Sequence, residues 1–280
     1  MRFGRALLTC FLCLGTMAVS MPAQAGPAES DRWALLIGIE QYQGRTQDIV
    51  GGQGDVNLMR DLLVRNGWSG ERIRTLTNHQ ATASAIRQGL EWIAGNCASP
   101  SSRCVVHYTG HTKRIHTGEG GEGLHEYLWP TDNRFISDTE FAGYMRRLNG
   151  HAWINVAACH AAGFDNGISS QKRVFTAASH EHEKAYEHPG WRTSIWNGLL
   201  VRDGLLGGQG DTNGDGHVTL AEAFSYGAEQ APRLTARQST GAQNPYTAGG
   251  NLHEWFAPTA STPTVTPAAT KNCILNLICL

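Results

Sequence analysis

Cys159 and His111 are the residues of this 280-residue chain best suited to covalent chemistry. A thiolate attacks a carbonyl carbon when a neighbouring imidazole removes or holds its proton. The two residues are 48 positions apart, and each directly or closely follows an apolar run, residues 103–109 and residues 153–158. The backbone N–H groups of Thr112 and Cys159 could receive the oxyanion of a tetrahedral intermediate. The sequence therefore predicts a thiol–imidazole pair that acts on a carbonyl substrate.

Each of these two residues also has a plainer interpretation. A single cysteine is most often a buried, inert side chain, and its position alone does not make it reactive. The chain contains 12 histidines, so one of them at the end of an apolar run is a weak coincidence. Both interpretations stay open on the residues alone.

The positioning of the pair depends on short apolar runs that alternate with amphipathic stretches. This pattern is typical of β-α-β units around a mostly parallel sheet. Polar side chains at the carboxyl ends of such strands meet at one edge of the sheet, where sites form. We expect strands at residues 33–39, 73–77, 103–109, 153–158 and 173–178. We expect helices that begin near Asp55, after Thr82, and at a capping box formed by residues 137–140 that leads into a helix through Leu148.

The N-terminus has the features of an export signal. Arg2 and Arg5 precede an apolar stretch at residues 6–20, and residues 23–25 read Ala-Gln-Ala, so we expect cleavage after Ala25. The apolar run is shorter than the ~20 residues that a spanning helix needs. We therefore expect an exported protein, periplasmic or secreted, with no stable membrane span once the signal is removed.

Five cysteines remain once the expected signal, with Cys10 and Cys13, is removed, and their spacing fits an oxidising compartment. Two local bridges, Cys97 with Cys104 and Cys273 with Cys279, leave Cys159 as the single thiol. The domain is expected at residues 26–256, followed by a flexible Ser/Thr/Pro-rich tail at residues 257–280 that carries the second cysteine pair. The formal net charge of −1 gives no reason to expect nucleic acid as a partner.

A second motif, at residues 211–222, fits the twelve-residue EF-hand loop. Such loops bind Ca²⁺ through oxygen ligands at positions 1, 3 and 5, a backbone carbonyl at position 7 and a bidentate acid at position 12, with glycine at position 6. These ligand positions are occupied, in order, by Asp211, Asn213, Asp215, His217 and Glu222. No regular incoming helix is expected before the loop, since residues 207–210 read Gly-Gly-Gln-Gly. We expect a structural calcium site, or else a Gly/Asp-rich turn.

Other candidate motifs are weaker. Residues 52–57 contain two glycines of a dinucleotide fingerprint but Asn57 stands in place of the third. His180, His182 and His188 could bind a transition metal, yet they alternate with glutamates at 181, 183 and 187 and are more simply interpreted as a solvated loop. Trp191 and Trp196 either line a cleft or pack in the core.

The segments WALLIGI, VVHYTGH and INVAACHAAGF, followed by VFTAAS, resemble the caspase-like cysteine peptidases, the clan of caspases, metacaspases, legumains and gingipains. The resemblance covers roughly residues 32–230. This range includes the candidate calcium loop, and similar loops occur in bacterial members of the clan. The resemblance implies the caspase-hemoglobinase fold, an α/β three-layer α/β/α sandwich with a mostly parallel sheet. It also implies hydrolysis of peptide bonds in a protein or peptide substrate by the dyad His111 and Cys159.

The chain departs from the pattern of this clan at three places. Thr112 stands where glycine usually follows the histidine, Ala157 replaces the acid or glutamine two residues before the cysteine, and Ala161-Ala162 replaces Ser-Gly. The commonest source of substrate preference is thus absent. Two functions follow: an exported cysteine endopeptidase, or a catalytically weak or inactive caspase-like domain that binds proteins.

Overall fold

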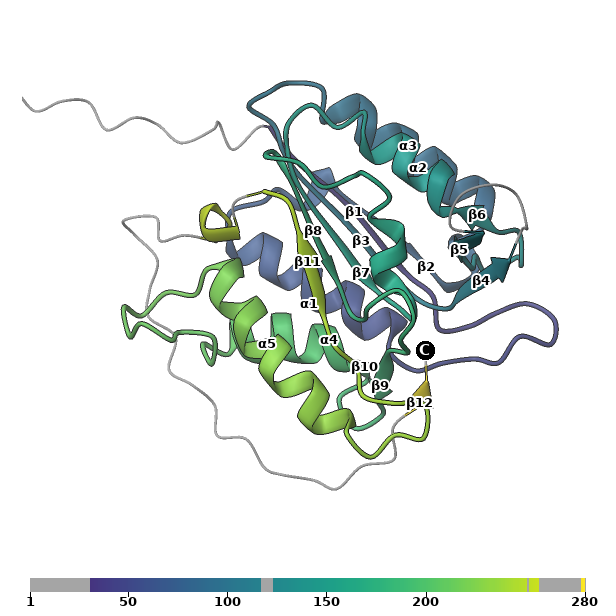
Figure 1. The fold of residues 1–280 in the computed structure, drawn as a ribbon. Helices are drawn as coiled ribbons and strands as arrows, with labels where there is room; N and C mark the ends of the chain where they lie inside the picture. The colour runs from purple at the N-terminus through teal and green to yellow at the C-terminus, as the bar shows by residue number, and fades with distance from the viewer. Residues whose placement is uncertain (1–30, 117–122, 251, 257–277, 280) are drawn as a thin grey trace, which may run out of the picture.

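A six-stranded sheet lies at the centre of the computed structural model, which describes residues 31–116, 123–250, 252–256 and 278–279 (Figure 1). The strand order is β11-β8-β7-β3-β1-β2. All neighbours pair in parallel except β11, which is antiparallel to β8. The strands are β1 (Arg32–Gly38), β2 (Ile73–Thr77), β3 (Arg103–Thr109), β7 (His151–Ala157), β8 (Arg173–Ala177) and β11 (Tyr246–Ala248).

Helices cover both faces of this sheet, so the molecule has three layers (Figure 1). One face is covered by α2 (Ala83–Asn96) and α3 (Asp138–Met145). The other is covered by α1 (Gly52–Arg65), α4 (Ile195–Asn197) with the π-helical η5 (Gly198–Leu206), and α5 (Leu220–Thr235). Short 3-10 turns complete the helical elements: η2 (Gly70–Arg72), η3 (Asn78–Gln80), η4 (Ala161–Phe164) and η6 (Leu252–Glu254). The predicted three-layer α/β/α sandwich is confirmed.

The strands are apolar throughout because both of their faces are buried. In β1, Leu35 and Ile37 pack toward the α2 and α3 layer, whereas Ala34 and Leu36 pack toward the α1 and α5 layer. Successive side chains of a strand point to opposite faces, so one continuous apolar run supplies two cores. This explains why residues 33–37 show no polar alternation.

Two small antiparallel sheets flank the carboxyl end of the central sheet. The first has the order β4-β5-β6 and comprises β4 (Thr112–His116), β5 (Leu124–Leu128) and β6 (Ile136–Ser137). The second has the order β10-β9-β12 and comprises β9 (Tyr186–His188), β10 (Thr193–Ser194) and β12 (Ile278–Cys279). Within the described ranges, no helix combines the length and the apolar character needed to cross a membrane.

Three local predictions need correction. Asp55 does not cap α1, because the helix begins at Gly52 and the buried Asp55 carboxylate instead accepts the Ser194 N–H at 2.9 Å. Ser137 caps α3 by accepting the Glu140 N–H, but α3 ends at Met145, before Leu148. The Glu140 carboxylate pairs with Arg87 rather than closing a capping box, because a bidentate guanidinium contact is available there.

The cysteine and tail predictions have mixed outcomes. Cys97 and Cys104 form the predicted disulfide, which joins the end of α2 to β3, and Cys159 is not in a disulfide. The tail is not wholly flexible, since its residues Ile278 and Cys279 pair with β9. The predicted export signal lies outside the described residues, and so does Cys273, the partner expected for Cys279.

Candidate active site

His111 and Cys159 follow two adjacent parallel strands at the same edge of the sheet. Thr109, the last residue of β3, lies opposite Ala157, the last residue of β7. Two residues further along, the two strands lead to His111 and Cys159. The side-chain oxygen of Thr112 donates a hydrogen bond to the backbone carbonyl of Cys159 at 2.7 Å, so the two segments are joined beyond the strands. The structure therefore brings the predicted thiol and imidazole to one sheet edge.

The turn between β3 and His111 requires glycine. Gly110 has a φ of 152°, and an added Cβ would lie 2.8 Å from the hydroxyl oxygen of Tyr42. That hydroxyl accepts the His111 N–H at 2.7 Å, while the Tyr108 hydroxyl donates to the His111 carbonyl at 2.6 Å. Two tyrosines thus fix the backbone on which the imidazole is carried.

The imidazole of His111 has a defined orientation. Its Nε2 lies 2.8 Å from the carbonyl oxygen of Gln47, and an N–H at Nε2 satisfies that acceptor. Nδ1 is then the unprotonated nitrogen and can accept a proton. The ring lies between Tyr42 and Trp129, with centroid distances of 4.9 and 5.8 Å.

The pKa of His111 is lowered from its ordinary value. Burial is the main cause, because a buried imidazole loses hydration of its charged form, and the cation of Lys184 lowers the pKa further. The hydrogen bond to Gln47 opposes both effects. His111 is therefore neutral near pH 7, as a general base must be.

The Cys159 thiol lies against the chain that leads into β9. The side chain is only 1% exposed, and its Sγ accepts the Ala185 N–H at 3.4 Å. Sγ also lies 3.7 Å from the Ala185 carbonyl oxygen. The backbone N–H and carbonyl of one residue, Ala185, therefore both contact this sulfur.

The chain turns sharply after Cys159. His160 has a left-handed backbone conformation, with φ 56° and ψ 24°, which is costly for a residue with a Cβ. Its ring donates from Nδ1 to the Glu181 carbonyl at 2.8 Å, and burial lowers its pKa to about 4. Ser179 holds the next residue, since its hydroxyl oxygen accepts the Ala161 N–H. The altered Ala161-Ala162 segment is thus a fixed 3-10 turn.

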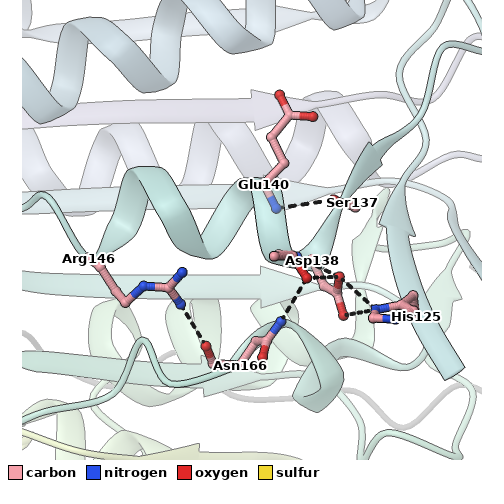
Figure 2. Close-up of polar contacts among 7 residues, drawn as sticks. His125, Ser137, Asp138, Glu140, Arg146 and Asn166 are labelled. Carbon is pink, nitrogen blue, oxygen red and sulfur yellow. Dashed lines mark hydrogen bonds and ion pairs between the residues drawn. The ribbon is translucent and has the colours of Figure 1, made fainter. Parts of the chain in front are cut away.

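The helix α3 fastens the far end of this turn (Figure 2). The Arg146 guanidinium donates to the Asn166 carbonyl at 2.9 Å, and the Asn166 amide reaches the Thr139 hydroxyl at 3.4 Å. Asp138, at the start of α3, in turn faces His125 of β5 at 3.4 Å. The loop that follows the nucleophile is therefore tied to α3, and α3 in turn contacts β5.

An open cavity of about 470 Å³ lies beside the imidazole. Its lining residues are Arg45, Thr46, Gln47, His111 and Trp129. Ligand pockets commonly begin at about 300 Å³, so this cavity can hold part of a substrate. It places the predicted base at the surface of the molecule.

Two buried carboxylates near the start of α1 were missed by the sequence analysis. Glu187 of β9 accepts the N–H groups of Val50 and Gly51 at 2.7 and 2.6 Å. Burial raises the pKa of Glu187 to about 8, against the lowering effect of these donors, and burial raises the pKa of Asp55 to about 7. The sequence signal that was available is the pair Gly51-Gly52, because a Cβ at Gly51 would collide with the Glu187 carboxylate.

The interpretation of residues 180–188 as a solvated loop is therefore wrong at its end. Glu187 and His188 are buried in β9, and His188 stacks on Trp191 with ring centroids 3.6 Å apart. His182 Nδ1 instead lies 2.8 Å from Arg114. Trp196 is fully buried and packs in the core.

The EF-hand-like loop is curled by its own side chains. The two carboxylate oxygens of Asp211 accept the N–H groups of Gly214 and Gly216. Asn213 donates its amide to Glu222, whose other oxygen accepts from Thr219. No group of three or more His, Cys, Asp or Glu side chains in the described part of the chain is arranged to hold a metal ion. As expected, residues 207–210 form no regular helix, and the π-helical η5 ends before them at Leu206.

The mostly parallel sheet covered on both faces, with a histidine and a cysteine after adjacent strands, is the arrangement found in caspase-fold proteins. Residues 31–247 match the caspase domain family of peptidases, Peptidase_C14. The chain belongs to this family.

Three known proteins show how far the similarity extends. Metacaspase-1 of Candida albicans is 32% identical over 121 residues, which cover 38% of this chain and 27% of that protein. The match thus spans about a quarter of the relative's own length. The GSU0716 structure from Geobacter sulfurreducens has a TM-score of 0.58 at 13% identity, covering 85% of this chain and 98% of that one. The Drosophila initiator caspase Dronc has a TM-score of 0.57 at 11% identity, covering 81% and 83%. These two structures share the fold.

Proposed function

We propose that the chain is a cysteine endopeptidase in which Cys159 is the nucleophile and His111 the general base. The observation that carries this proposal is the joint placement of the two side chains at adjacent strand ends, with the imidazole oriented by Gln47. Membership of a peptidase family supports it. The substrate is a protein or peptide, and the bond hydrolysed is a peptide bond.

The reaction follows from the orientation of the ring. Nδ1 of His111 takes the proton of the Cys159 thiol, and the thiolate attacks the carbonyl carbon of the substrate. The imidazolium then protonates the leaving amine, which departs and leaves an acyl-enzyme. Water, deprotonated by the same imidazole, hydrolyses the thioester, and the proton returns to sulfur.

The oxyanion formed in each half-reaction needs hydrogen-bond donors. We assign this role to the backbone N–H groups of Thr112 and Cys159. Trp129 donates its N–H to the His111 carbonyl, so the alternation of an antiparallel pair directs the Thr112 N–H away from β5. The Thr112 side chain, which stands where glycine usually follows the histidine, donates its hydroxyl to the Cys159 carbonyl.

The test is cleavage of a peptide library by the chain from residue 26 onward. Cys159→Ala is expected to reduce cleavage to background, and His111→Ala to lower kcat/KM by at least about 100-fold. His79→Ala, which removes an exposed histidine, is the control and should stay within twofold. Cleavage that survives Cys159→Ala would refute the proposal.

A second function, binding without catalysis, is favoured by the near-complete burial of Cys159. Alkylation by iodoacetamide separates the two functions. A nucleophile paired with imidazole reacts rapidly near neutral pH, whereas an inert buried thiol does not. Protection of the thiol in the folded protein together with absence of cleavage would establish the binding function.

We also propose that Ca²⁺ binds the loop at Asp211, Asn213, Asp215, the His217 carbonyl and Glu222. The loop supplies the hard oxygen donors that Ca²⁺ prefers, and its glycines are already in the conformations that bring them together. Binding requires Glu222 to exchange its bonds with Asn213 and Thr219 for the ion. The role proposed is structural, and export of the protein is proposed with it, on the basis of the N-terminal sequence.

A further inference from the structure

The outer edge of β9 is occupied by a segment from the far end of the chain. Glu187 and Tyr186 of β9 pair with Ile278 and Cys279 of β12, in antiparallel register. The other edge of β9 pairs with β10. In Figure 1, β12 lies beside β9 at the end of the sheet where the candidate active site lies. The outer edge of β9 therefore accepts an added strand, and in this structure that strand is β12 of the same chain.

This strand position leads directly to the nucleophile. Ala185, the residue before β9, contacts Cys159 Sγ through both its N–H and its carbonyl. Because Ile278 lies opposite Glu187 and Cys279 opposite Tyr186, β12 runs toward Ala185. A peptide bound in this direction approaches the thiol with its C-terminal side. That is the direction a substrate needs if the residues bound to β9 precede the bond that is cleaved.

The edge is also rigid, which suits a docking surface. Glu187 is held by Val50 and Gly51 at the start of α1. The Tyr186 N–H donates to the Gln243 side chain at 2.9 Å, and its hydroxyl donates to the Gly241 carbonyl at 2.6 Å. Strand addition obtains its affinity from backbone hydrogen bonds, so a fixed edge accepts many extended sequences.

The sequence around β12 fits such an edge. Residues 272–280 read NCILNLICL, without a charge, a proline or a glycine. Ile278 of β12 is β-branched, a type of side chain that is enriched in strands. A segment tethered to its own docking site has an effective concentration on the order of millimolar, so a free peptide must compete with it.

We propose that β12 is an internal ligand of the substrate strand position on β9, and that it must leave before a peptide can bind beside Cys159. Inhibition of cleavage, as the consequence, rests on the proposed peptidase function. Docking of β12 does not, because it can be measured without cleavage.

The test displaces β12 by Ile278→Pro, which removes a backbone donor and fixes φ against strand pairing. Ala268→Pro places the same residue outside β12 and is the matched control. If β12 occupies the site nine-tenths of the time, Ile278→Pro should lower KM for a peptide substrate about tenfold. Ala268→Pro should leave KM unchanged.

A binding measurement in the Cys159→Ala background makes the docking step independent of catalysis. The probe is a fluorescein-labelled synthetic peptide with the sequence of residues 272–280, followed by fluorescence anisotropy. It should bind the Ile278→Pro protein at least about tenfold more tightly than the parent or the Ala268→Pro protein. Hydrogen exchange at the β9 amides should rise in Ile278→Pro and fall again when the peptide is added.

Equal peptide binding by the parent and by Ile278→Pro, with cooperative melting in both, would overturn the inference. A chain shortened after residue 271 repeats the comparison if Ile278→Pro does not fold. If no variant cleaves any peptide but the difference in peptide binding persists, the docking of β12 stands and the proposed peptidase function fails.

Discussion

The hydroxyl of Thr112, the residue after His111, joins the His111 segment to the Cys159 backbone. Thr112 donates to the Cys159 carbonyl, and we expect this bond to position the thiol relative to the imidazole rather than to take part in the chemistry. Thr112→Val should lower kcat about tenfold, the equivalent of one hydrogen bond of about 1.4 kcal/mol, with little change in KM. Thr112→Ser keeps the donor and should restore kcat. A loss in Thr112→Ser equal to that in Thr112→Val would show that the methyl group, not the hydroxyl, matters.

The lowered pKa of His111 predicts the pH dependence of cleavage. The base is active when neutral, so activity falls as pH drops through its pKa. Since burial and then Lys184 lower that pKa, the acid limb of kcat/KM should have its midpoint below pH 6.5. Lys184→Gln removes a repulsive cation and should move the midpoint to higher pH. A wild-type midpoint above pH 7, or no shift in Lys184→Gln, would contradict this assignment.

The sequence was sufficient to select His111 and Cys159 but not their supporting contacts. The two residues are recognisable because each stands near the end of an apolar strand. Gln47 acts through its backbone carbonyl, so its side-chain type carries no signal. The role of Thr112 depends on the packing of two segments 47 residues apart, which no local pattern encodes.

At the scale of elements, Glu187 anchors β9 to the start of α1. Glu187→Ala would leave the Val50 and Gly51 N–H groups without an acceptor, and an unsatisfied buried donor costs about 1–3 kcal/mol. We therefore expect the free energy of unfolding, measured with urea, to fall by at least about 2 kcal/mol. Glu71→Ala, at an exposed glutamate, should change it by less than about 0.5 kcal/mol. Equal effects of the two substitutions would exclude an anchoring role.

The long elements of the central layer were predictable, and the short antiparallel ones were not. The strands β2 and β3 match their predicted ranges, since burial on both faces produces apolar runs that stand out from the helices. The strands β9 and β10 contain three and two residues, and β9 carries a buried glutamate. Its charge suggested solvent because the acceptor role of the carboxylate depends on α1, more than 130 residues away. The pairing of β12 was hidden for the same reason.

At the scale of the whole molecule, Asp55 makes stability depend on pH. Its pKa is raised by burial from 3.8 to about 7, so the folded state holds the proton more tightly than the unfolded state. The contribution of protonated Asp55 to stability is complete below about pH 4 and is lost as pH rises to about 7. Relative to Asp55→Asn, the wild type should lose up to about 4 kcal/mol of unfolding free energy over this interval. Urea titrations at pH 5 and pH 8 measure the part of this loss above pH 5, about 3 kcal/mol. The control is Asp61→Asn, in an exposed ion pair. Equal changes in unfolding free energy between the two pH values for the wild type and Asp55→Asn would contradict the prediction.

Calcium should stabilise the whole domain by binding the folded state. A ligand at 100 times its dissociation constant adds about 2.7 kcal/mol, which raises the melting temperature of a protein of this size by several degrees. The measurement is a melting scan in millimolar Ca²⁺ and in excess chelator, repeated on Glu222→Gln. Asp203→Asn, outside the loop, is the control. Equal melting temperatures of the wild type in Ca²⁺ and in chelator would show that the loop is a turn.

The strand order β11-β8-β7-β3-β1-β2 has a consequence for the chain as it is being synthesised. The strands β1, β2 and β3 are made first and are neighbours, and β7, β8 and β11 are then added one after another to the edge that β3 leaves exposed. The nascent chain can therefore extend its sheet in the order of translation, without inserting a late strand between early ones. His111 follows β3 and Cys159 follows β7, so the imidazole has no thiol beside it until β7 has docked. A nascent chain that ends before β7 therefore lacks the thiol of the candidate dyad.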